Sequence, residues 1–288
     1  MTDAEPGTLT FPIPEAMVRR AREFRGEPAT PRPAATVVLL RPDEDKFQLY
    51  VLKRAKTMVF GGLYAFPGGG VDPTDRPETL RTDWASRLGV ADEQARAIVG
   101  AAARELFEEA GVLLAGPLDE PDRTVSDGTL GGSVTHGREV DDDLVVGDVS
   151  AADWEADRAA IAARELTLTE VLQRRGLRLR DDLLFPWARW ITPEFEPKRF
   201  DTWFFVALLP EGQTARDVSG ESEVAAWARA QAAEELPMLP PTLSTVNSFR
   251  PYEKIAEVIA ASSRRDAATP VMPRVVFRED GSALLHIE

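Results

Sequence analysis

Runs of apolar residues separated by polar turns divide the chain into short strands and helices. Val37–Leu40 and Phe47–Leu52 are β-branched and apolar, and the polar segment Pro42–Asp45 lies between them. This pattern predicts a strand, a loop and a second strand that together form a hairpin. A short aromatic strand is expected at Leu63–Phe66, just before a run of glycines.

The clearest helical segment runs from about Asp92 to Ala110, and Gly111 follows it as a candidate left-handed C-cap. Further helices are expected near 14–24, 82–88, 151–174 and 223–235, and from Pro240-Pro241 to about 262. Further strands are expected at Leu184–Ile191, Thr202–Leu208, Arg274–Phe277 and Ala283–Ile287. Strands and helices that do not alternate strictly indicate an α/β fold of the α+β kind, or a layered α/β/α arrangement.

The same patterns suggest how the chain is organised. We expect an N-terminal extension at 1–33, one main domain at 34–262 and a closing segment at 263–288. Within the main domain, 71–91 has the character of an insertion. The stretch 116–150 is acidic and glycine-rich with weak periodicity, which is typical of a variable surface loop.

Charge and composition narrow the classes of function. The net charge of −14 over 288 residues opposes nucleic acid or an anionic membrane as a partner, because their phosphates would be repelled. A small phosphorylated substrate remains compatible, since bound metal ions can reverse the local field. The chain has no cysteine, which excludes disulfides, thiolate metal sites and a cysteine nucleophile.

Two further expectations concern location and assembly. Neither a secretory signal nor an apolar stretch long enough to span a membrane is recognisable, so we expect a cytoplasmic protein. The sequence is compatible with a homodimer.

Three acidic residues stand out on the long predicted helix. At about 100° per residue, Glu105, Glu108 and Glu109 fall within an arc of roughly 100°, beside an apolar stripe. Like charges at this spacing repel one another, and the helix dipole disfavours anions near a C-terminus. A hard divalent cation would convert this repulsion into coordination. The alternative interpretation is a solvated acidic helix face.

The segment around these acids resembles the signature of the Nudix hydrolase superfamily. Arg104–Val112 matches R-E-U-x-E-E-x-G-U, where U is aliphatic, at every fixed position, and Phe66-Pro67-Gly68-Gly69 is similar to the tetrapeptide that opens the motif. The resemblance implies a Nudix α/β/α sandwich with a mixed sheet and an extra C-terminal helix. It also implies a metal-dependent pyrophosphohydrolase that acts on a small nucleoside diphosphate derivative.

The resemblance assigns roles to several residues of the helix and the glycine turn. Glu105, Glu108 and Glu109 are expected to hold Mg²⁺ or Mn²⁺, with Glu109 as a candidate base. Arg104 is expected to hold the carboxylates in place through a charge-assisted pair. It could instead be a simple i,i+4 partner of Glu108. Gly68 and Gly69 are expected to contact the substrate.

Residues outside the motif complete the candidate site. Glu221, which precedes Trp227, is expected as a further metal ligand or general base, and Glu223 is the second choice because it could equally cap a helix. Arg54 could bind a substrate phosphate or cap a strand end. Arg199 is a weaker candidate for phosphate binding, together with its neighbour Lys198.

The chain departs from the usual motif in two places. The segment 71–91 separates the glycines from Arg104, and the glutamate that usually supports the motif would fall at position 96, where this chain has Arg96. Glu93 is a candidate substitute. The split motif resembles the branch typified by peroxisomal coenzyme A diphosphatases, as do Trp190–Pro193, Lys198–Phe205 and Leu239–Thr242.

This second resemblance implies that coenzyme A or an acyl-CoA is cleaved to a phosphopantetheine and adenosine 3′,5′-bisphosphate. Two alternatives remain open at this point. One is a pyrophosphatase that acts on ADP-sugars or dinucleotides. The other is a regulatory Nudix domain that binds a nucleotide without turnover.

Overall fold

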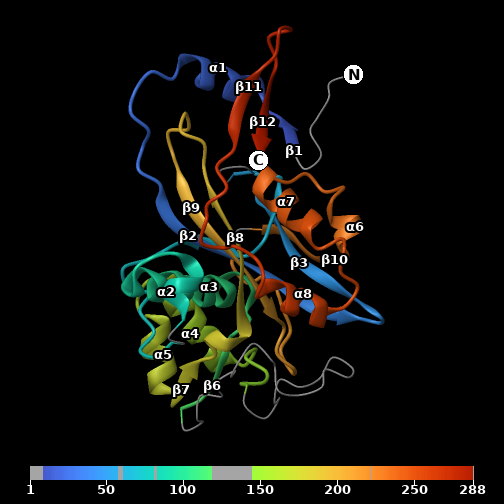
Figure 1. Cartoon of the computed structure of the whole chain (residues 1–288). Helices are drawn as coiled ribbons and strands as arrows, with labels where there is room; N and C mark the ends of the chain where they lie inside the picture. Colours follow the sequence, from blue (N-terminus) through green and yellow to red (C-terminus); the bar gives the residue numbers. More distant parts are fainter. Residues whose placement is uncertain (1–8, 58–60, 81–82, 119–144, 221, 288) are drawn as a thin grey trace.

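The computed structural model describes residues 9–57, 61–80, 83–118, 145–220 and 222–287 (Figure 1). The central sheet has seven strands, and five of them form a continuous path in the order β10-β3-β2-β9-β8. These five are β2 (Arg32–Asp43), β3 (Lys46–Arg54), β8 (Leu184–Ile191), β9 (Phe200–Leu208) and β10 (Ser222–Ala228). The short strands β4 (Tyr64–Ala65) and β5 (Gly68–Gly70) pair with β3 and β2 respectively.

The sheet is mixed, as expected. β2 and β3 form the predicted antiparallel hairpin, with Leu40 opposite Leu49. β2 runs parallel to β9, from Arg32 opposite Phe200 to Leu40 opposite Leu208. The hydrogen-bonded central position of β2 explains its continuous apolar sequence, because both faces of such a strand are covered.

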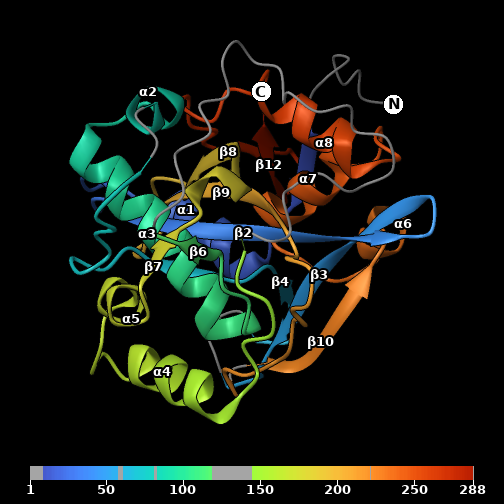
Figure 2. The same ribbon diagram turned by 90° about the horizontal axis from the view of Figure 1, so that it is seen from below.

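Successive residues of β2 contribute to two different apolar cores. Val37 and Leu39 belong to the core beneath α3 (Asp92–Ala110), whereas Val38 and Leu40 belong to the core on the opposite face. Figure 2 shows α3, α4 (Ala152–Ala162) and α5 (Leu168–Arg174) on one side of β2, with α7 (Pro240–Ser248) and α8 (Ile255–Ser262) on the other. The predicted α/β/α sandwich is confirmed.

The helix α3 begins and ends where the sequence predicts. Asp92 and Glu93 lie in its first turn, where acidic side chains complement the helix dipole. The C-cap residue Gly111 has φ of 63°, a left-handed conformation that a side chain disfavours. The buried residues of α3 include five alanines, whose small side chains favour a close approach of the helix to β2 and β5.

Three predicted helices differ from the structure. The one expected from Pro240-Pro241 to about 262 is two helices, α7 and α8, separated by residues 249–254. The segment 223–235 is mainly strand β10, followed by the short helix α6 (Ala230–Ala233). The free edge of β3 offers hydrogen bonds to this alanine-rich stretch, and Trp227 packs on Tyr50 with 5.1 Å between ring centroids. Tertiary pairing therefore overrides helix propensity here.

The single helix expected at 151–174 is two helices, α4 and α5. The chain reverses at Arg164, which has φ of 62°, and α5 begins with a capping box formed by Thr167 and Glu170. Local capping chemistry that the sequence contains thus explains the break.

The ends of the described chain form a second sheet of order β1-β12-β11. Its strands are β1 (Leu9–Pro12), β11 (Arg274–Phe277) and β12 (Ala283–Ile287), and the last two match the predicted closing strands. β1 was not expected from the sequence. The remaining elements are α1 (Glu15–Glu23), α2 (Trp84–Leu88), β6 (Ala115–Pro117), β7 (Leu177–Leu179) and a 3-10 helix at Asp181–Leu183.

Across the part of the chain that the structure describes, every helix is too short or too polar to cross a lipid bilayer. The variable loop was predicted at 116–150, and residues 119–144 of it lie outside the described residues.

The core on the α7 and α8 face depends on one aromatic stack. Trp187 and Phe249 are both almost fully buried, and their rings stack with 4.6 Å between centroids. We expect Phe249→Ala to lower the free energy of unfolding by about 3–5 kcal/mol, because it removes apolar contacts and leaves a cavity. Urea unfolding measures this value.

Phe277→Ala is the matched control, since Phe277 is 45% exposed. It should change the free energy of unfolding by no more than about 0.5 kcal/mol. Equal effects of the two substitutions would contradict this description of the core.

Candidate active site

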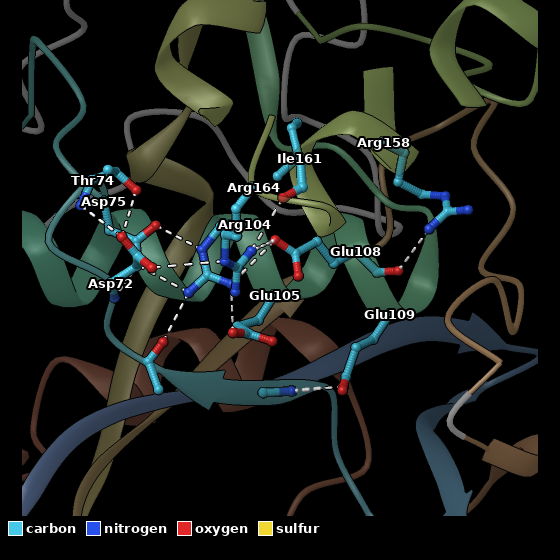
Figure 3. Close-up of polar contacts among 12 residues, drawn as sticks. Asp72, Thr74, Asp75, Arg104, Glu105, Glu108, Glu109, Arg158, Ile161 and Arg164 are labelled. Carbon is cyan, nitrogen blue, oxygen red and sulfur yellow. Dashed lines mark hydrogen bonds and ion pairs between the residues drawn. The ribbon is translucent and has the colours of Figure 1, made fainter. Parts of the chain in front are cut away.

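The C-terminal half of α3 lies against the glycine strand β5 (Figure 3). The backbone N–H of Gly68 donates to Oε2 of Glu109 at 3.0 Å. A Cβ at Gly69 would lie only 2.5 Å from Oε1 of Glu105, so any larger residue at this position would displace that carboxylate. The motif glycines therefore let the backbone come close to two of the three helix carboxylates.

Arg104 is the centre of the hydrogen-bond network. Its guanidinium donates from Nε to Oδ1 of Asp75 at 2.7 Å and from Nη2 to Oδ2 of Asp75 at 2.9 Å. Nη2 also donates to the carbonyl of Gly70 at 2.8 Å. Nη1 donates to Oε1 of Glu105 at 2.5 Å and to Oε1 of Glu108 at 3.2 Å. Arg104 thus contacts two of the acidic residues, but its bidentate partner is Asp75.

Arginines near α4 neutralise the outer acidic residue. Arg164 donates to Oε1 of Glu108 at 2.5 Å, and Arg158 donates to the backbone carbonyl of Glu108 at 3.2 Å. Arg158 is also paired with Glu155, which accepts a further bond from Arg216 at 2.7 Å. The repulsion expected among the helix acids is therefore offset by cations from other elements.

Burial changes the protonation properties of this network. Desolvation raises the pKa of Glu105 above its usual value, against the opposing effect of Arg104. Desolvation likewise raises the pKa of Asp75, again opposed by its bonds to Arg104. Burial alone would lower the pKa of Arg104, but its bond to Asp75 and the charges of the glutamates raise it above the ordinary value. Arg104 is therefore a permanent cation.

The three helix glutamates do not point in one direction. Figure 3 shows Glu105 and Glu109 directed toward β5, whereas Glu108 is directed toward Arg104 and Arg164. Within the described ranges, no group of three or more histidine, cysteine or acidic side chains is arranged to hold a metal ion.

The donor chemistry nevertheless fits a hard divalent cation. Carboxylate oxygens are the ligands that Mg²⁺ and Mn²⁺ prefer. Glu105 is only 7% exposed, and the cradle at Gly69 that a Cβ would fill leaves room for its carboxylate. Oε2 of Glu105 and Oε2 of Glu108 accept no hydrogen bond from any residue that the structure describes.

The other predicted site residues are placed as follows. Arg54 is the last residue of β3, and its backbone bonds to Gly62 and Leu63 across the turn that leads to the glycine strand. Glu223 lies in β10 rather than at a helix start, and it pairs with Lys53 at 3.4 Å. Glu221 lies outside the described residues.

Arg199 has a structural environment. It is 8% exposed, and its guanidinium donates to the backbone carbonyls of Thr192 and Ala29 at 3.0 and 2.8 Å. These bonds anchor the chain just before β9, at the point where Arg32 begins β2. The guanidinium therefore bonds to the protein backbone, and phosphate binding by Arg199 and its neighbour Lys198 stays a prediction.

The substitute carboxylate considered at Glu93 does not reach Arg104. Glu93 is 74% exposed and pairs with Arg76 at 3.0 Å. The residue that sequence reasoning missed is Asp75, which lies in the inserted segment, and no periodicity there distinguishes it from its acidic neighbours.

Comparison with known proteins agrees with this fold and motif. Residues 30–187 match the model of the NUDIX domain. The crystal structure of a NUDIX hydrolase from Alicyclobacillus acidocaldarius is similar to this chain, with 26% identity and a TM-score of 0.57 over 81% of this chain and 96% of that chain. None of the proteins with a curated function matches.

More distant structures are also similar. The NUDIX domain of Shewanella oneidensis NrtR, crystallised with ADP ribose, has 12% identity and a TM-score of 0.40 over 83% of this chain and 98% of that chain. The Nudix hydrolase RenU from M. smegmatis has 14% identity and a TM-score of 0.37 over 79% of this chain and 87% of that chain.

The family match covers more than half of the chain, so the protein belongs to the NUDIX domain family. The predicted class of enzyme, a pyrophosphohydrolase, is confirmed by this match and by the hydrolase from A. acidocaldarius. Enzymes of this family generally use divalent metal ions.

Gly69 provides a test of the contact between β5 and α3. Gly69→Ala places a methyl group where the Glu105 carboxylate lies, so that flexible side chain must move while the backbone can remain. We expect a fold of nearly unchanged stability and turnover that is lower by about 10²-fold, the typical cost of a misplaced catalytic group.

Gly70→Ala is the control, because a Cβ there meets nothing within 4 Å. Thermal unfolding and steady-state turnover distinguish the two variants. Wild-type turnover in Gly69→Ala would show that the glycine is not needed for the placement of Glu105.

Proposed function

We propose that this Nudix pyrophosphohydrolase cleaves the phosphoanhydride of coenzyme A or of an acyl-CoA, giving a phosphopantetheine and adenosine 3′,5′-bisphosphate. The observation that carries the hydrolytic part is the close contact between the glycine strand β5 and the acidic flank of α3. Glu105, Glu109 and Arg104 all bond to, or lie against, that strand.

In this proposal Glu105, Glu108 and Glu109 hold Mg²⁺ or Mn²⁺, and Glu221 is a further ligand. The bound cations would neutralise charge on the diphosphate oxygens. The protein has a net charge of −14, so it would repel an anionic substrate. Bound cations would reverse the local field and remove this repulsion.

Glu109 is the proposed general base. Its Oε2 is held by the Gly68 N–H, so the carboxylate has a defined position next to the glycine strand. From there it takes the proton of the water that attacks phosphorus. Glu221, which lies outside the described residues, is the other candidate for this role.

The choice of a coenzyme A substrate is supported by sequence features that now have a place in the fold. The inserted segment 71–91 separates the two halves of the motif, and its residues Asp75 and Pro77 contact α3. Arg54 ends β3 beside the turn at Gly62, which leads to the glycine strand. We propose that its guanidinium binds a phosphate of the substrate.

The substrate class is tested with a panel. Purified protein is assayed with Mg²⁺ and with Mn²⁺ against coenzyme A, acetyl-CoA, NADH, ADP-ribose and 8-oxo-dGTP. We expect the highest kcat/KM for coenzyme A or acetyl-CoA, with adenosine 3′,5′-bisphosphate as a product identified by mass spectrometry. A higher kcat/KM for NADH or ADP-ribose would instead indicate a dinucleotide or ADP-sugar pyrophosphatase.

The role of Glu109 is tested by Glu109→Gln, which keeps size and hydrogen bonding but removes the base. We expect kcat to fall by about 10²–10⁴-fold, the usual contribution of general acid–base catalysis. Glu93→Gln is the control on the same helix, because Glu93 is exposed and pairs with Arg76 away from the site. Turnover of Glu109→Gln close to that of the control would refute the assignment.

A further inference from the structure

We propose that Arg164, in the turn between α4 and α5, binds a phosphate of the substrate, and that it exchanges its ion pair with Glu108 for that phosphate when Glu108 binds a metal ion. This inference deepens the proposed function, and it rests on that function for the metal-binding role of Glu108. It assigns the turn after α4 to recognition of the diphosphate.

Two arginines meet at one oxygen of Glu108. Nη1 of Arg164 donates to Oε1 at 2.5 Å, and Nη1 of Arg104 donates to the same oxygen at 3.2 Å. Figure 3 shows both guanidinium groups directed at Glu108. The side chain of Arg104 is 3% exposed, whereas that of Arg164 is 47% exposed. Arg164 is therefore the outer cation and the replaceable one, because an ion pair with an exposed partner contributes little net free energy.

The other contacts of Arg164 leave much of its guanidinium available. Nη1 also donates to the backbone carbonyl of Ile161 at 3.2 Å, and Nε lies 3.7 Å from Oδ2 of Asp72. Nη2 makes no hydrogen bond with any residue that the structure describes. A guanidinium carries five N–H donors in a planar fork that matches the oxygens of a phosphate. Arg164 can thus offer two parallel donors to a phosphate.

The backbone of Arg164 is strained. Its φ of 62° lies in the left-handed region, where glycine is favoured and a long side chain costs free energy. Strain of this kind gathers at functional sites, because the side chain is needed at that place. The turn between α4 and α5 alone would be satisfied by glycine. An arginine at this position is therefore explained by what its guanidinium contacts.

Arg158 differs from Arg164 although it also contacts Glu108. It donates to the backbone carbonyl of Glu108 at 3.2 Å and to Oε2 of Glu155 at 2.9 Å, and its side chain is only 12% exposed. A cation on the carboxylate of Glu108 would leave both bonds intact. Arg158 thus stays in place, and Arg164 is the arginine that can exchange partners.

The exchange follows from the charges involved. A divalent cation on the Glu108 carboxylate would repel a guanidinium that lies 2.5 Å from one of its oxygens. The diphosphate of a substrate would bring negative charge to the same place. Charge-assisted bonds between arginine and phosphate are among the strongest hydrogen bonds in proteins. The long side chain of Arg164 can turn from carboxylate to phosphate without movement of the backbone.

The first test measures Mn²⁺ affinity of the full chain by the EPR signal of the free ion, with no nucleotide present. We expect Arg164→Gln to bind Mn²⁺ about 2- to 5-fold more tightly than the wild type, because a cation that competes for Glu108 is removed. The sign of the change is informative. Removal of a residue that only held Glu108 in place would weaken Mn²⁺ binding instead.

The second test measures binding of methylenediphosphonate, a diphosphate analogue with a carbon bridge that resists hydrolysis, by calorimetry at saturating Mn²⁺. We expect Arg164→Gln to weaken this binding by about 10- to 100-fold, the usual effect of a lost hydrogen bond to a charged group. KM for the preferred substrate of the panel should rise by a similar factor, with a smaller change in kcat. Arg164→Lys, which keeps the charge but not the fork, should recover part of the affinity.

Two further variants serve as controls. Arg174→Gln removes an arginine of α5 that is 54% exposed and pairs with Asp157, so it should change neither affinity. Arg164→Gly removes the side chain and relieves the backbone strain, so it should be no less stable than Arg164→Gln in urea. Its two affinities should change as those of Arg164→Gln do. It is the deciding variant if Arg164→Gln does not fold.

The outcomes separate this inference from the proposed function. Mn²⁺ binding that is not tightened, or methylenediphosphonate binding that is not weakened, overturns the inference and leaves the function standing. Equal changes in Arg174→Gln also overturn it, because they would show a general effect of net charge. A wild-type chain that neither binds Mn²⁺ nor hydrolyses any substrate of the panel overturns the proposed function, and the role of Arg164 with it.

Discussion

A buried guanidinium organises this protein. Arg104 is almost completely excluded from solvent, and each of its three nitrogen atoms bonds to an oxygen of the protein. A buried charge is stable only when it is paired and hydrogen-bonded, and removal of one partner leaves an uncompensated charge in a region of low dielectric constant. The helix α3, the glycine strand β5 and the inserted loop must therefore all stand in the positions that satisfy Arg104.

That constraint explains the composition of the elements around it. The alanines of α3 allow the helix to approach the sheet, and the glycines of β5 allow its backbone to reach Glu105 and Glu109. Larger side chains in either element would move α3 away from the sheet and take the carboxylates out of contact with β5. The result is a group of acids held at fixed positions by a rigid helix and strand, which is the requirement for precise chemistry on a charged substrate.

The charges of the chain are distributed in agreement with this arrangement. The protein as a whole is acidic, yet arginines gather near the acidic end of α3: Arg104 within the helix, and Arg158 and Arg164 beside it. These cations lower the repulsion among the glutamates in the absence of any ligand. Membership in the NUDIX domain family and the class of hydrolase follow from the motif that these residues build.

Local signals in the sequence were sufficient for the elements with strong periodicity and clear caps. The bounds of α3 and of the closing strands β11 and β12, and the left-handed Gly111, agree with the structure because each depends on residues within a few positions of one another. The motif also identified Glu105, Glu108, Glu109 and Arg104 as one group, since the helix itself places them together. Their roles remain predictions.

Only the tertiary structure decided the features that depend on distant partners. The segment 223–235 carries alanines that favour a helix, but the open edge of β3 makes most of it strand β10. Asp75 gives no local sign of its role, because its partner lies 29 residues away and the ion pair exists only after the insertion folds onto α3. The sequence directly determines those features, such as helix bounds and caps, that depend on contacts between neighbouring residues. Pairing of strands, and of charges, across the fold is determined by the free energy of the whole packed arrangement, which no short segment contains.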